Sequence, residues 1–98
     1  MSLLVRYTLK SEEDHARQTG AMAALVAALT SEDVPVHYSC FSTDVPTEFI
    51  GVLEFADEAG KQAFLASSAF AAYRDMVGPT FANPPQTTEL NAIATTRN

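Results

Sequence analysis

The sequence predicts a single α+β domain of the ferredoxin-like type, in which a four-stranded antiparallel sheet carries two helices on one face. Three observations support this prediction. The 98 residues are 47% hydrophobic and 18% charged, which is enough for one buried core. Segments with alternating and with helical hydrophobic spacing follow one another in the order β-α-β-β-α-β. No linker or repeat divides the chain, so we expect residues 1–98 to form one domain.

The first strand is predicted over residues 3–10, because alternate positions there form one fully apolar face: Leu3, Val5, Tyr7 and Leu9. A helix follows, with Ser11 as its cap and three acids in its first turn. It is expected to end near Leu29, before a segment rich in helix breakers. Helical spacing predicts its inner face: His15, Gln18, Met22, Leu25 or Val26, and Leu29.

Two further strands, over residues 36–43 and 48–55, are predicted to form a hairpin around the turn residues 44–47. The first has Val36, Tyr38 and Cys40 on one face and His37, Ser39 and Phe41 on the other. Gly51 lies in the middle of the second strand, which indicates either a bulge or close packing against the backbone.

A second helix is predicted to begin at Asp57, to be interrupted at Ser67–Ser68 and to end at Gly78–Pro79. Its inner face is predicted to be a stripe spaced by three and four residues: Ala59, Ala63, Ala66, Phe70, Tyr73 and Val77. The last strand is predicted over residues 87–94 after a long loop, and loops of that length are more often functional than neutral.

Two helices on one face leave the other sheet face uncovered. That face is predicted to have Ile50 and Val52 at its centre and also to carry Leu4, Arg6, Thr8 and Glu54. Monomers rarely expose such a patch, so we expect a homodimer that pairs through this open sheet face. The alternative is that one or two exposed aliphatic side chains belong to an ordinary monomer surface.

Charge and cysteine content exclude several classes of protein. Six basic and twelve acidic residues give a net charge of −6, which argues against nucleic acid or an anionic membrane as the partner. The longest apolar run, residues 20–29, is too short to span a bilayer, and the first residues lack signal-peptide features. A lone Cys40 and two histidines without ligand spacing make a metal site improbable. A cytoplasmic location is therefore expected.

The segments TEFIGVLEFADEA (residues 47–59) and FLASSAF (residues 64–70) resemble the signature of the antibiotic biosynthesis monooxygenase domain. Residues 7–10 and Pro84–Pro85 fit the same pattern, so the resemblance covers nearly the whole chain. It implies a dimeric α/β barrel with the helices outside. It also implies the oxidation of a small phenol- or quinol-like aromatic by O₂ without any cofactor, although other members of the superfamily degrade haem or have no known reaction.

The chain departs from the family pattern in helix two and at the end of strand three. Phe55 stands where a Trp is common, and Phe64 and Ala69 stand where histidines are frequent. Arg74 stands where haem-degrading relatives have a histidine ligand, which disfavours haem. These departures favour an alternative, a non-catalytic small-ligand-binding or stress-associated protein of the same superfamily.

Oxidation of a phenol without a cofactor needs a group that removes a proton, and imidazole titrates near neutrality. We therefore expect His37 or His15 to be the base, with His37 preferred because a strand holds it more rigidly. Tyr7 is expected to position the substrate oxygen. Each residue also has a structural alternative. His37 could be a strand residue half exposed to solvent, His15 a helix-edge residue bonded to a carbonyl, and Tyr7 a core tyrosine.

Substrate binding is assigned to an aromatic slot formed by Phe55, Phe64 and Tyr73, to which Phe70 and Phe81 could also contribute. Arg74 could bind an anionic oxygen of the ligand. The alternatives are ordinary core packing for the aromatic residues, and for Arg74 a surface ion pair with Asp75 or Glu58.

Overall fold

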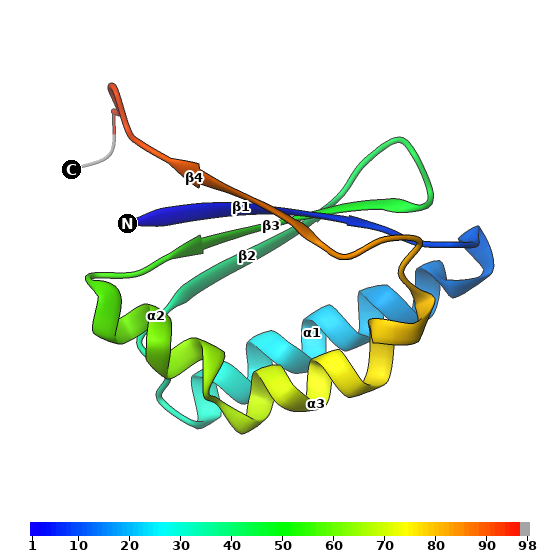
Figure 1. Cartoon of the computed structure of the whole chain (residues 1–98), viewed down its shortest axis with the longest axis horizontal. Coiled ribbons are helices and arrows are strands. Elements are labelled where there is room, and N and C mark those ends of the chain that lie inside the picture. Colours follow the sequence, from blue (N-terminus) through cyan, green and yellow to red (C-terminus); the bar gives the residue numbers. More distant parts are fainter. Residues whose placement is uncertain (97–98) are drawn as a thin grey trace.

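The computed structural model describes residues 1–96 and confirms the predicted order of elements (Figure 1). In chain order these are β1 (Ser2–Thr8), the 3₁₀ turn η1 (Glu12–Asp14), α1 (His15–Ser31), β2 (His37–Ser42), β3 (Glu48–Glu54), α2 (Glu58–Leu65), α3 (Ser68–Val77), the 3₁₀ turn η2 (Gly78–Thr80) and β4 (Gln86–Leu90).

The strands form one antiparallel sheet in the order β2-β3-β1-β4, with β1 and β3 at its centre. Figure 1 shows the helices beneath one face of the sheet, while the opposite face is uncovered. The sheet of the single chain is open, so the closed barrel implied by the family resemblance would need a second copy. No helix in the described range has the length and hydropathy needed to cross a membrane.

Side-chain caps begin the helical segments, at Ser11 and Asp57 as predicted and also at Ser67, where only an interruption is predicted. Ser11 Oγ accepts a hydrogen bond from the backbone N–H of Glu13 at 3.1 Å. Asp57 Oδ1 accepts from Gly60 N at 3.0 Å, and Ser67 Oγ accepts from Phe70 N at 3.2 Å. The Ser67 cap ends one helix and starts another, so the predicted second helix is two helices, α2 and α3.

That division explains an error in the predicted inner stripe. Ala59, Ala63 and Ala66 are exposed, whereas Gly60 and Phe64 are the buried residues of α2. The predicted stripe is spaced as if the helix were continuous. The break shifts which positions face the core, so the spacing does not carry over from α2 to α3. The prediction is correct in α3, where Tyr73 and Val77 are buried and Phe70 is half-buried. The last strand is also shorter than predicted and ends at Leu90 instead of Ala94.

The core lies between the sheet and the helices. The sheet contributes alternate residues of β1 and β3, and one residue just after each of these strands, as predicted: Val5, Tyr7, Leu9, Phe49, Leu53 and Phe55. The helices contribute Gln18, Ala21, Met22, Leu25 and Leu29 from α1, and Phe64, Ala69, Tyr73 and Val77 from α2 and α3.

Gly51 allows two tyrosines to lie against the backbone of β3. The pairing of β3 with both neighbours runs without interruption, so there is no bulge. A Cβ atom at this position would lie 2.9 Å from Tyr38 Oη and 3.3 Å from the Tyr7 ring. The close-packing interpretation of this glycine is therefore confirmed.

Replacing Gly51 by alanine should lower the free energy of unfolding by about 1–3 kcal/mol, because the added methyl group overpacks a rigid, hydrogen-bonded pair of rings. Gly20→Ala is the matched control, since nothing lies within 4 Å of its Cβ position. It should be neutral or stabilise the protein by up to about 1 kcal/mol through helix propensity. Urea denaturation measures both; a neutral Gly51→Ala would contradict the packing argument.

Candidate functional site

A cavity of about 670 Å³ lies between the sheet, helices α2 and α3, and the loop of residues 78–85 that leads to β4. This volume is in the range of sites that hold a small organic molecule. The sheet contributes mostly aliphatic side chains to its lining: Leu3, Val5, Leu53 and Thr87. Seven residues that the sequence analysis named for the site also line it: Tyr7, Phe55, Phe64, Phe70, Tyr73, Arg74 and Phe81.

The loop after α3 is bound to the end of β1 and so forms a fixed wall of the cavity. Lys10 N donates to Thr80 O at 2.9 Å, and Ala82 N donates to Thr8 O at 2.7 Å. Leu9 and Phe81 form an isolated β-bridge between these two contacts. The bridge fixes the backbone of Phe81, whose ring lies 5.5 Å from that of Tyr7, centroid to centroid. Pro84 and Pro85 continue the wall toward β4.

Aromatic rings form the part of the wall that belongs to the helices. The Phe64 ring lies 4.7 Å from that of Phe70 and 6.0 Å from that of Phe55, as measured between centroids. Arg74 extends over the outer ring of this cluster, with Cζ 4.9 Å from the Phe70 centroid. The guanidinium therefore lies at the border of the aromatic surface, which is a favourable cation–π position.

Three hydrogen-bonded tyrosines lie in or beside this apolar wall. Tyr7 Oη and Tyr38 Oη are 2.8 Å apart, and Gln18 Nε2 donates to Tyr73 Oη at 2.8 Å. The rings of Tyr7 and Tyr73 meet edge to face, with centroids 6.2 Å apart. Because Tyr73 Oη accepts from Gln18, its own proton can be donated elsewhere. Tyr7 and Tyr73 line the cavity, while Gln18 and Tyr38 support them from outside its lining.

Burial raises the pKa of Tyr7, Tyr38 and Tyr73 above the ordinary value of 10.0. The nearby Tyr7 raises the pKa of both of the other tyrosines further. These hydroxyls are consequently protonated at neutral pH, so they can donate hydrogen bonds but cannot remove a proton. Burial also raises the pKa of the Cys40 thiol to about 11, so the nucleophilic thiolate form is scarce at neutral pH.

Neither histidine lies in this cavity. His15 Nδ1 is 2.8 Å from Pro46 O, to which it donates, and its ring lies 4.9 Å from that of Phe49. His37 is exposed on the uncovered sheet face, because it alternates along β2 with Tyr38, whose hydroxyl contacts Tyr7 beneath the sheet. The structure therefore does not bring either proposed base together with Tyr7. The histidine positions agree with the structural alternatives.

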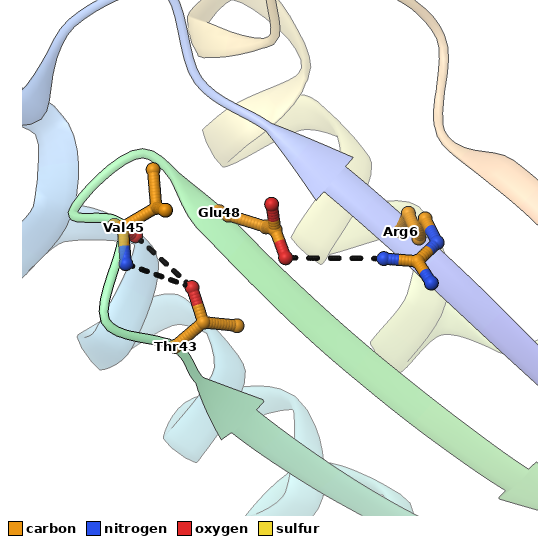
Figure 2. A network of polar contacts seen from close by, with 4 residues as sticks. All are labelled: Arg6, Thr43, Val45 and Glu48. Atoms are coloured by element: carbon orange, nitrogen blue, oxygen red, sulfur yellow. Dashed lines mark hydrogen bonds and ion pairs between the residues drawn. The ribbon is translucent and has the colours of Figure 1, made fainter.

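The uncovered face has a half-exposed apolar centre bordered by charges. Directly paired positions place Leu4 beside Val52, and Ile50 between Arg6 and Phe41. The Phe41 side chain is 51% exposed. Figure 2 shows that Arg6 reaches Glu48 from the neighbouring strand, at 3.8 Å from Nη1 to Oε1. Close by, the hydroxyl of Thr43 accepts from Val45 N in the hairpin turn (Figure 2).

Lys10 and Lys61 also line the cavity, and sequence reasoning missed both. No local pattern distinguishes these lysines from surface lysines, because Lys10 follows β1 and Lys61 lies in α2, and only the tertiary fold brings both to the lining of one cavity. Within residues 1–96 no group of three or more His, Cys, Asp or Glu side chains could hold a metal ion.

The sequence matches no protein-family model and no curated protein. Solved structures do match. A crystal structure of an antibiotic biosynthesis monooxygenase has a TM-score of 0.82 at 16% identity, covering 95% of this chain and 98% of its own. The chain has the fold of that monooxygenase.

Two other structures extend this comparison. SnoaB from Streptomyces nogalater, a cofactor-independent oxygenase solved as a mutant, has a TM-score of 0.77 at 13% identity, covering 99% of this chain and 96% of its own. A protein of unknown function from Nitrosomonas europaea has a TM-score of 0.80 at 23% identity, covering 99% and 92%. The family resemblance seen in the sequence is thereby confirmed at the level of this monooxygenase fold.

Proposed function

We propose that the protein is a cofactor-independent monooxygenase that oxidises a small phenol-like aromatic with O₂. The observation that carries this proposal is the cavity: aromatic residues, among them two tyrosines with protonated hydroxyls, and an arginine line a space of about 670 Å³. A fold shared with a cofactor-independent oxygenase supports it. The reaction would convert a phenol with a free para position into a quinone, with one atom of O₂ entering the ring and the other leaving as water.

The proposed chemistry requires the substrate to supply the electrons, and an ionised phenol gives them up more readily than the neutral form. Tyr7 and Tyr73 would donate hydrogen bonds to the anionic oxygen, and Arg74 would balance its charge. The aromatic walls would exclude bulk water from the reacting ring. Because neither histidine lines the cavity, we propose that the phenol proton passes to water at the cavity mouth.

Tyr7→Phe should lower kcat/KM by about 10²-fold with 1-naphthol, because it removes one hydrogen bond to the developing anion. His37→Ala should stay within about twofold of the wild type, since this side chain lies on the opposite face of the sheet. Oxygen uptake and ¹⁸O incorporation into 1,4-naphthoquinone measure both rates. A large loss in His37→Ala with full activity in Tyr7→Phe would place the reaction outside the cavity.

One observation favours a second function, that of a non-catalytic small-ligand-binding protein: the cavity has no histidine to act as a base. The same assay separates the two functions. Aromatic ligands that raise the melting temperature without any protein-dependent oxygen uptake would support the binding protein.

We also propose that the protein is a homodimer that pairs through the uncovered sheet face. The half-exposed aliphatic centre of that face and its exposed Phe41 support this assembly.

A further inference from the structure

The charges around the cavity differ from those of the whole chain. The sequence has six basic and twelve acidic residues. Nevertheless, Lys10, Lys61 and Arg74 line this one cavity, and no aspartate or glutamate is among the described residues that line it. An acidic protein has thus gathered half of its basic side chains at one apolar site.

We propose that the cavity selects ligands that carry an anionic oxygen, either a carboxylate or an ionised phenol, on an aromatic body. This inference rests on the proposed function and specifies its substrate class. Apolar walls would receive the aromatic body, while the cations at the border would bind its charged oxygen.

The three cations come from separate elements, so local sequence spacing does not explain why all three line one cavity. Lys10 follows β1, and its backbone is held by Thr80 O at 2.9 Å. Lys61 belongs to α2 and Arg74 to α3. Only the tertiary fold brings them to the same cavity.

The cations also retain their capacity to bind an anion. In the described part of the chain, none of the three has a carboxylate within 4.0 Å, so the ion pairs considered for Arg74 with Asp75 or Glu58 do not form. Arg74 instead lies over the face of Phe70, which leaves the edges of the guanidinium able to donate to a ligand oxygen.

The aromatic surroundings should strengthen the attraction. A charge pair beside low-dielectric walls interacts more strongly than the same pair in open water. Tyr7 and Tyr73 line the same cavity, and their hydroxyls are protonated and carry no negative charge that would oppose an anion. No side chain of the described lining would repel it.

The test compares two probes of the same shape, 2-naphthoate and the neutral 2-naphthamide, by isothermal titration calorimetry at neutral pH and low salt. The carboxylate should bind at least tenfold more tightly, and added salt should reduce that preference. Arg74→Gln, Lys10→Gln and Lys61→Gln should each reduce it. Arg17→Gln is the matched control, because it removes the same charge from an exposed position of α1 that does not line the cavity.

A second probe, 4-nitrophenol, tests the phenol arm, because its phenolate absorbs visible light and its neutral form does not. Binding should increase that absorbance if the cavity favours the ionised phenol. The inference is supported if the protein prefers the anionic form in only one of the two experiments, and that experiment identifies whether the group is a carboxylate or a phenolate.

Three results would overturn the inference. Equal affinity for naphthoate and naphthamide, with no change in nitrophenol absorbance, would overturn it while leaving the proposed function in place. If all three lining variants keep the preference for naphthoate over naphthamide, the anion is not bound by Lys10, Lys61 or Arg74 and the inference is overturned. No binding of any probe would overturn the proposed function as well.

Discussion

No tyrosine of the folded protein should ionise at pH 10, where an ordinary tyrosine is half ionised. All three tyrosines of the sequence belong to the buried network beside the cavity, and burial raises the pKa of each. The absence of tryptophan makes the near-ultraviolet absorbance of tyrosinate a clean measurement. Titration should show tyrosinate only as the chain unfolds.

The same pKa shifts determine the direction of the pH effect on stability. Each tyrosine hydroxyl has a higher pKa in the folded chain than in the unfolded chain, so it loses its proton more easily after unfolding. The free energy of unfolding is therefore unaffected below pH 10 and decreases as the pH rises further. Cys40 acts in the same direction above its ordinary pKa of 9.0. Each group changes the free energy of unfolding by up to about 1.4 kcal/mol per pH unit. Because four groups contribute, a small domain should unfold within a few pH units above pH 10.

Circular dichroism followed beside the tyrosinate absorbance tests this coupling. Both signals should change together at alkaline pH. Tyr38→Phe provides a comparison, because it removes one of the ionising groups but retains the ring against Gly51. An ordinary titration centred near pH 10 in a chain that remains folded would contradict the burial of the network.

The fold was predictable because its determinants are local. The alternation from Leu3 to Leu9 identifies the buried face of β1, and a mid-strand Gly51 correctly indicates close packing. The α2 stripe was predicted wrongly because the cap at Ser67 changes the helical phase, and the size of that change depends on tertiary packing. The break at Ser67–Ser68 is visible in the sequence, but the predicted stripe continues across it in a single helical register.

The candidate site was predictable only in part. Tyr7 and Tyr73 were found because they belong to inner faces, and the cavity lies between those faces. The position of His37 away from the cavity follows from the same alternation, since Tyr38 faces the helices. Lys10 and Lys61 could not be predicted, because they belong to separate elements and only the tertiary fold makes both line one cavity.

The open sheet face leads to the second large effect. Ile50→Lys should convert the proposed dimer of about 21 kDa, twice the chain mass of 10.5 kDa, into monomers. The new ammonium would be buried without a partner at the interface, and a stable interface cannot accommodate such a charge. It would also lie directly opposite Arg6, the strand neighbour of Ile50, so like charges would repel each other.

Multi-angle light scattering at micromolar concentration measures this change, since the two masses differ by a factor of two. Ala24→Lys is the matched control: it adds the same charge at an exposed position of α1, on the side of the sheet that carries the helices, and the dimer should persist. Circular dichroism should show that both variants remain folded, because Ile50 is only half-buried in the single chain. A wild-type mass of 10.5 kDa would instead mean that this face is an ordinary monomer surface, with Leu4, Ile50 and Val52 exposed to water.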